Sequence, residues 1–188
     1  LRYYLIKEVS FGNDGNISKE KLENCINSDL ANNYGNLCQR VFSFIKNNCQ
    51  SKVSKTEKQS SADKNLINQT KSLTKDLKNL MNDQNLNSYI KLVVDISFLT
   101  NKYINDEEPW KLKKSDLEKM NNILHLSLEQ IAKISILLNP IIPIATNKVL
   151  DVLKVKAKLR TLAFLDGSEI LPTDVHIGEM DILFKKIN

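Results

Sequence analysis

One aromatic side chain stands out among the residues that could take part in binding chemistry. Trp110 is the only tryptophan of the chain and directly follows Pro109, within the polar and charged stretch Asn105–Lys114. Because proline has no N–H and disfavours a helical residue before it, a helix through Tyr103 should end here. An indole at such a corner could stack on an unpaired base, the commonest way in which proteins hold single-stranded RNA. The alternative is an apolar anchor between two helix ends, because tryptophan is highly buried on average.

No other residue pattern indicates catalysis. The sequence has no glycine-rich phosphate loop, no Ser/His/Asp grouping and no recognisable pair of carboxylates. The cysteines lack CxxC spacing and are interpreted as thiols of a reducing compartment, and the two histidines lie far apart, so we expect no metal site. These residues are Cys25, Cys38, Cys49, His125 and His176. The chain is therefore interpreted as a binding module.

The positive charge of the chain is concentrated in one segment. The 188 residues carry a net charge of +5, and residues 40–80 hold nine basic and three acidic residues, against 18 and 19 elsewhere. Within this segment, Lys71, Lys75 and Lys78 follow one another at helical spacing and are candidate phosphate contacts. A solvated basic helix face is the alternative. No apolar run is long enough to span a membrane.

Helical periodicity accounts for most of the chain and predicts an all-α fold, an antiparallel helical bundle with a short irregular C-terminal tail. A turn is predicted at Phe11–Asn16, a loop at Cys49–Asn65, and turns beyond Leu159, where Asp181–Asn188 forms a short strand or a docked tail. The predicted helices are Arg2–Val9, Ser18–Asn27, Ser28–Asn48, Leu66–Leu80, Ser88–Asn105, a helix capped by Ser115 that ends at Asn139-Pro140, and Ile141–Val155.

The helix predicted over Ser28–Asn48 has two distinct faces. Its apolar face carries Leu30, Tyr34, Leu37, Val41 and Phe44 at alternating spacings of four and three. The polar side is predicted to carry Asp29, Asn33, Asn36, Arg40, Ser43 and Asn47. Asn36 and Arg40 are one turn apart, so their side chains can reach the same point in space. The acidic run Asp106-Glu107-Glu108 is interpreted as a solvated helix end.

Three blocks of the sequence together resemble the C-terminal portion of methionyl-tRNA synthetase, a class I aminoacyl-tRNA synthetase. They are LRYYLIKE from Leu1, INSDLANNYGNLCQR from Ile26 and YINDEEPWKLKK from Tyr103. The family has an LRYYL-type stretch, then a helix with the pattern N-A-D-L-x-N-x-x-x-N-L-x-x-R, and later an A-P-W motif. Two departures are EEP in place of a small residue before the proline, and LFKKI where the family has an L-F-P-R-I-like ending.

This resemblance implies a role in reading the anticodon. The anticodon-reading positions of the family fall on Asn36, Arg40 and Trp110, with the indole stacked on the first base of the CAU anticodon and the other two side chains bonded to base edges. It divides the chain into the end of a connector from the catalytic domain (residues 1–17), a helical anticodon-binding domain (18–158) and a C-terminal tail (159–188). The alternatives are the equivalent domain of a valine, isoleucine, leucine or cysteine enzyme, and a helical protein-interaction scaffold.

The resemblance also implies what the parent enzyme does. It would be a methionine–tRNA ligase that uses ATP with Mg²⁺, with zinc as a further candidate in its catalytic part, and this chain alone would be inactive and hold no cofactor. Its partners would be methionine tRNA and its own catalytic domain, and we expect a cytoplasmic monomer, because no appended dimerisation domain follows Asn188. Lys52–Thr56, KVSKT, resembles the KMSKS loop of class I enzymes, but that loop precedes the LRYYL block in the family, so we interpret the match as chance.

Overall fold

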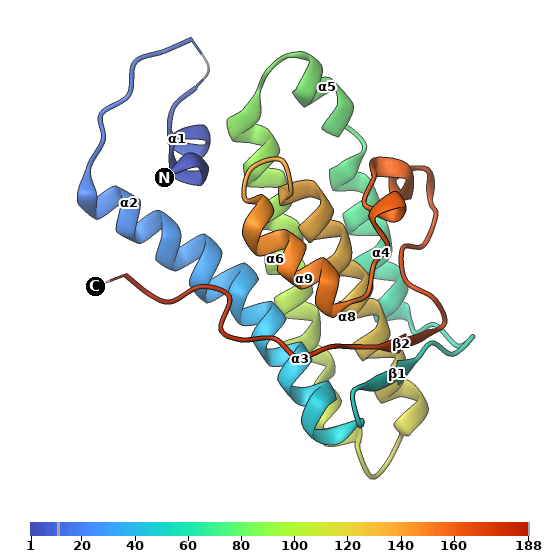
Figure 1. Cartoon of the computed structure of the whole chain (residues 1–188). Coiled ribbons are helices and arrows are strands. Elements are labelled where there is room, and N and C mark those ends of the chain that lie inside the picture. Colours follow the sequence, from blue (N-terminus) through green and yellow to red (C-terminus); the bar gives the residue numbers. More distant parts are fainter. Residues whose placement is uncertain (11, 188) are drawn as a thin grey trace.

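The computed structural model describes residues 1–10 and 12–187, and within them helices form the body of the protein (Figure 1). The fold class is therefore the helical bundle that the sequence predicts. The helices are α1 (Arg2–Glu8), α2 (Lys19–Cys25), η1 (Ile26–Gly35), α3 (Asn36–Asn48), α4 (Ser61–Thr74), α5 (Leu77–Asn82), α6 (Leu86–Glu107), α7 (Pro109–Leu112), α8 (Leu117–Leu138), α9 (Pro143–Val152), η2 (Ala157–Leu159) and η3 (Leu162–Asp166). None of these helices is long and apolar enough to cross a lipid bilayer.

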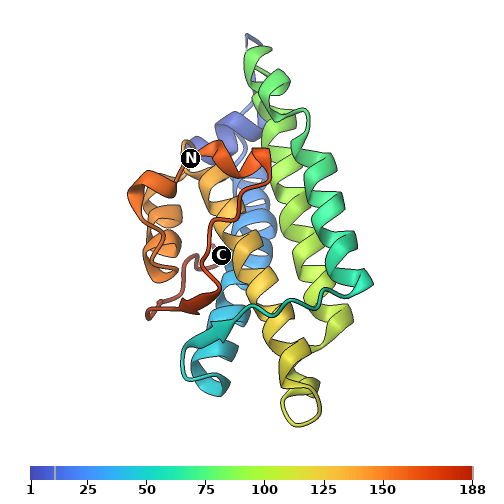
Figure 2. The same cartoon turned by 90° about the vertical axis from the view of Figure 1, so that its right-hand side faces the viewer.

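The centre of the bundle is the pair α6 and α8, which are joined by the short α7 and pack against each other. Most residues of α8 are buried, so this helix is surrounded by the others. Figure 2 shows α4 beside α6, and Tyr103 near the end of α6 donates a 2.6 Å hydrogen bond to Asp63 in the first turn of α4. The two helices are therefore antiparallel, as expected for neighbours in such a bundle.

The segment from α2 to α3 is one continuous helical run rather than two helices. Its middle part, η1, is a π-helix of ten residues. A π turn closes i→i+5 bonds and holds one more residue than an α turn, so the polar face predicted at α-helical spacing does not hold there. Asp29 and Asn33, predicted on the polar side, are buried, whereas Asn36 in α3 is exposed.

Several predicted boundaries were wrong. The loop predicted at 49–65 contains strand β1 (Lys52–Ser54) and the start of α4, whose first turn is fixed by a capping box between Ser60 and Asp63. The helix predicted over 66–80 is broken between α4 and α5. The residue that caps α8 is Asp116 rather than Ser115, because the Asp116 carboxylate accepts from the Lys119 N–H at 2.9 Å.

Residues beyond 159 pack onto the bundle. Strand β2 (Asp174–His176) pairs antiparallel with β1, so that Val53 lies opposite Val175. The last described residues run along α3 and α2 (Figure 1), where the Asn27 amide exchanges hydrogen bonds of 2.8 and 2.9 Å with the backbone of Ile187. The final segment is thus a docked tail without a strand. Phe11 of the predicted turn and Asn188 lie outside the described residues.

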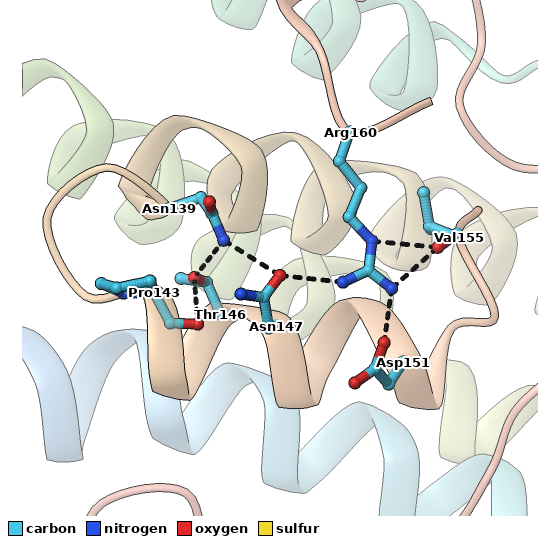
Figure 3. A network of polar contacts seen from close by, with 7 residues as sticks. All are labelled: Asn139, Pro143, Thr146, Asn147, Asp151, Val155 and Arg160. Atoms are coloured by element: carbon cyan, nitrogen blue, oxygen red, sulfur yellow. Dashed lines mark hydrogen bonds and ion pairs between the residues drawn. The ribbon is translucent and has the colours of Figure 1, made fainter. Parts of the chain in front are cut away.

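One arginine holds the beginning of this C-terminal segment against α9. The Arg160 guanidinium donates to the backbone carbonyl of Val155, to the Asn147 side chain and to the Asp151 carboxylate (Figure 3). Asn139, at the end of α8, donates to the same Asn147 oxygen. The planar guanidinium can satisfy these three acceptors at once, two on α9 and one just after it, which a lysine ammonium does with less fixed geometry.

Candidate nucleic-acid interface

A sharp corner after α6 positions the tryptophan. The helix ends at Glu107, and Glu108 takes a left-handed conformation with φ 44° and ψ 59°. Pro109 occupies the first position of α7, where its missing N–H removes no helical hydrogen bond. The prediction that Pro109 stops the helix is confirmed. The helix ends at Glu107, two residues after the predicted end at Asn105. Trp110 is therefore carried on a four-residue helix that projects from the end of the bundle.

The Trp110 side chain forms part of an open pocket. Trp110 is 41% exposed, and most of the residues around it are apolar. The pocket has a volume of about 340 Å³ and is lined by Arg40, Val41, Phe44, Ile104, Pro109, Trp110 and Leu124. Because α3, α6, α7 and α8 all contribute, residues far apart in the sequence meet at this corner.

The structure brings Arg40 directly to Trp110. The guanidinium carbon lies 5.7 Å from the centre of the indole ring, within the range of a cation–π contact. Arg40 also donates a 2.7 Å hydrogen bond from Nη2 to the Asn105 side chain. Two contacts from different elements therefore hold the guanidinium at the rim of the pocket. Asn36 lies one turn before Arg40 on α3 and is exposed.

Sequence reasoning did not find Asn105. It lies 65 residues from Arg40, and its side chain meets the guanidinium only because α3 and α6 pack side by side. Its position five residues before Trp110 was the only available signal, and that spacing does not by itself indicate a contact with Arg40.

The acidic run beside Trp110 lies at the solvent-accessible surface, as predicted, and is paired with lysines. Each of its three carboxylates forms an ion pair with a lysine: Asp106 with Lys102 at 2.5 Å, Glu107 with Lys119 at 2.9 Å, and Glu108 with Lys111 at 2.7 Å. The hydrogen bond to Glu107 raises the pKa of Lys119 above its usual value. This pairing reduces the repulsion that three unpaired carboxylates would exert on an approaching phosphate.

The three candidate phosphate contacts lie at the other end of the bundle. Lys71, Lys75 and Lys78 are exposed and, together with Leu165, line a shallow hollow over the end of α4 and the start of α5. The α4–α5 segment leads into the first turn of α6, whereas Trp110 follows its last turn. A helix of 22 residues is about 33 Å long, so these lysines do not share the pocket of Trp110.

The KVSKT segment is part of the small sheet. Val53 is buried, Lys52 pairs with Asp174 at 3.7 Å, and Lys55 pairs with Glu169. Both lysines therefore have carboxylate partners inside this chain, which supports the interpretation that the match to an ATP loop is chance.

The cysteines and histidines lie apart from the pocket. Burial raises the pKa of the Cys25 thiol to about 11 and that of Cys38 further still, which disfavours the thiolate form of both. The His125 ring nitrogen Nε2 lies 2.8 Å from the carbonyl oxygen of Pro172, a structural contact. Within residues 1–10 and 12–187, no three His, Cys, Asp or Glu side chains gather as a metal site would require.

Two protein-family models match the chain. Residues 53–188 match the family described as the anticodon binding domain of methionyl tRNA ligase. Residues 1–42 match the family described as tRNA synthetases class I (M). Between the class I enzymes that the sequence left open, these matches favour methionine.

Curated and solved relatives agree with these matches. The methionine–tRNA ligase of Brucella suis is 37% identical over 163 residues, which cover 87% of this chain and 32% of that protein. That of Rickettsia typhi is 34% identical over 191 residues, covering 100% of this chain and 38% of the relative.

The free-state crystal structure of Mycobacterium tuberculosis methionyl-tRNA synthetase has a TM-score of 0.91 at 27% identity, covering 100% of this chain and 38% of that one. A structure of the same enzyme bound by methionyl-adenylate has a TM-score of 0.90 at 28% identity, covering 98% of this chain and 37% of that one. The chain thus spans 32–38% of the length of these curated relatives.

Proposed function

The chain belongs to the methionyl-tRNA ligase family, and from that premise we propose that it reads the CAU anticodon of methionine tRNA. The observation that carries the proposal is the contact between the Arg40 guanidinium and the half-exposed ring of Trp110, at the rim of an open pocket. An aromatic face and a planar cation at one rim are the groups that proteins use to hold an unpaired base.

Each of the three side chains has its own task in this proposal. The free face of Trp110 stacks on the first anticodon base, because stacking needs only an accessible aromatic surface. Arg40 donates to acceptors on the edges of the neighbouring bases from a fixed planar fork. Asn36, exposed one turn away on the same helix, offers both a donor and an acceptor and can therefore distinguish base edges.

We further propose that Lys71, Lys75 and Lys78 contact tRNA phosphates away from the anticodon. Their place around the end of α4 and the start of α5, outside the pocket of Trp110, is compatible with a helical stem that leaves the anticodon loop and follows the bundle. Basic side chains that meet phosphates supply affinity without base specificity. If these lysines instead form only a solvated helix face, replacing them would leave tRNA binding unchanged.

For the parent protein we propose a cytoplasmic, monomeric methionine–tRNA ligase. Its activation of methionine with ATP and Mg²⁺, and any zinc that it holds, are assigned to the part that the relatives have in addition to this chain. The adenylate complex of the Mycobacterium tuberculosis enzyme supports ATP chemistry in that relative. Accordingly, this chain by itself should catalyse no methionine-dependent exchange of pyrophosphate into ATP.

The experiment that tests the proposed function compares two tRNAs. Binding of the protein is measured to methionine tRNA and to the same tRNA with a valine anticodon in place of CAU. Tighter binding of the CAU form supports the proposal, and equal binding of both forms contradicts it. If neither tRNA binds at physiological salt, the helical protein-interaction scaffold is the better interpretation.

A further inference from the structure

A large aromatic side chain outside the three proposed anticodon readers is exposed on α6. Phe98 is 52% exposed, although phenylalanine is among the residues most often buried in folded proteins. It lies in the middle of a 22-residue helix whose opposite side is packed into the core. Single exposed apolar residues are common and need no explanation by themselves. The neighbours of Phe98 on the helix surface decide whether its exposure has a functional explanation.

Phe98 belongs to a line of residues with a mixed chemistry. Lys91, Phe98 and Asn105 are seven residues apart, which is close to two helical turns, so they lie on the same face of α6. All three are exposed. Lys91 takes part in no ion pair within the described residues. A cation, an aromatic ring and an amide in one line are the groups that contact phosphates, bases and base edges.

This line of residues ends at the proposed anticodon site. Asn105 accepts the 2.7 Å hydrogen bond from Arg40, so the last residue of the line touches one of the readers. One turn beyond Phe98, the Asn101 amide donates to the Asn33 side chain at 2.9 Å, which holds α6 against η1. Phe98 therefore lies near the seam between α6 and the η1–α3 run. Along the axis it is about 10 Å from Asn105.

We propose that Phe98 is a second stacking platform, for an unpaired base of the same RNA loop that is not one of the three anticodon bases. Lys91, a further two turns away, contacts a backbone phosphate of the same strand. The proposal rests on the proposed function, because it places the loop between α3 and α6. Stacking tolerates any base, since every base has an aromatic face, so Phe98 contributes affinity and no anticodon discrimination.

The test measures tRNA binding by Phe98→Ala, Phe98→Leu and Phe98→Trp variants. Phe98→Ala should weaken binding about 5- to 150-fold, equally for the CAU tRNA and for the anticodon-swapped tRNA. Phe98→Leu should weaken it similarly, because leucine keeps the apolar surface and loses the ring, whereas Phe98→Trp should bind as tightly as the wild type. Ile144→Ala, at an exposed apolar residue of α9, is the matched control and should have no effect.

A second measurement examines the phosphate contact. Lys91→Ala should make the dependence of log K on log salt concentration shallower by about 0.7–0.9, and Phe98→Ala should leave that slope unchanged. Circular dichroism verifies that each variant is folded. If the wild type discriminates between the anticodons but Phe98→Ala binds like Ile144→Ala, the second platform is wrong while the proposed function stands. If the wild type shows no discrimination, the proposed function itself fails.

Discussion

At the scale of single residues, two of the three proposed readers, Arg40 and Trp110, contact each other within the chain. Arg40 lies over the Trp110 ring and is bonded to Asn105, so its long side chain is held in one place. A guanidinium fixed in advance loses less conformational entropy on binding than a free one. Trp110 is 41% exposed, and its exposed part is where we expect a base to stack.

Replacing Trp110 by alanine tests the stacking contact. We expect Trp110→Ala to cost about 1–3 kcal/mol of binding free energy with the CAU tRNA, because one base loses its stacking partner. The loss should approach zero with an anticodon-swapped tRNA, whose loop is not well read. Helical content measured by circular dichroism should not change, since the residue lies at the rim of the bundle. Unchanged binding of both tRNAs, or loss of the fold, would contradict the assignment of the indole to the anticodon.

Replacing Arg40 by lysine tests the planar donor group. The charge is kept, but the fixed fork of donors is lost. A hydrogen bond that involves a charged group contributes about 1.5–3 kcal/mol, so Arg40→Lys should weaken binding of the CAU tRNA roughly tenfold or more. Arg160→Lys is the matched control, because Arg160 lies in the network on α9, and it should leave tRNA affinity unchanged. Equal affinities of the two variants would show that Arg40 acts only through its charge.

At the scale of elements, the π-helical run η1 leads directly into the helix that carries Asn36 and Arg40. It is held to α6 by Asn33, which is buried and accepts hydrogen bonds from Ser97 and Asn101, each at 2.9 Å. Gly35 ends the run, and a Cβ there would lie 2.7 Å from the carbonyl oxygen of Leu30. Because π turns rotate the next helical residues about the axis relative to a regular α-helix, η1 decides which way α3 presents its side chains.

Replacing Asn33 by alanine tests whether its hydrogen bonds to α6 position α3. Removing the acceptor of the buried Ser97 hydroxyl should lower the free energy of unfolding by about 1–3 kcal/mol. For a chain of this size, each kcal/mol corresponds to a Tm decrease of about 2–4 °C. The preference for the CAU tRNA should also fall, since α3 is less firmly placed. Ser127→Ala, which removes a buried hydroxyl bonded within its own helix, is the control for stability alone. If Asn33→Ala and Ser127→Ala discriminate the anticodons equally well, the hydrogen bonds between Asn33 and α6 do not position α3.

At the scale of the whole molecule, the proposed base-reading groups and the cluster of Lys71, Lys75 and Lys78 lie in different parts of the bundle. The corner at Trp110 has its carboxylates paired with lysines, whereas Lys71, Lys75 and Lys78 surround a hollow at the far end of α4. Such a separation suits a long rod-shaped ligand that is read at its tip and held along its side by its phosphates.

Replacing all three of these lysines by glutamine tests the far-end contact. Binding of the CAU tRNA and of the swapped tRNA should weaken by the same factor, because phosphates carry no sequence information. The slope of log K against log salt concentration should become shallower by about 0.7–0.9 for each phosphate that the variant no longer neutralises. A triple variant with Lys148, Lys154 and Lys156 replaced, around the end of α9, has the same change in charge and should retain more of the slope. Equal slopes in the two triple variants would mean that net charge alone matters.

Much of this architecture follows from local signals in the sequence. The apolar spacing predicts the helices around Tyr34 and Tyr103, and Pro109 predicts the break that leaves Trp110 at a corner, because periodicity and proline act on neighbouring residues. Asn36, Arg40 and Trp110 were singled out as candidates from residue type and from a resemblance carried by three blocks. Their roles in RNA binding remain predictions.

Tertiary packing decided the rest. The contact between Arg40 and Asn105 joins residues 65 apart, and the hydrogen bond between Ser54 and Asp174 joins residues 120 apart. Neither pairing leaves a trace in local periodicity, because it exists only once separate elements have packed. The π turns of η1 buried Asp29 and Asn33 against the expected spacing, since Lys7, Tyr3 and α6 offered them partners. Satisfying those buried polar groups outweighed the regular α-helical repeat that the sequence pattern suggests.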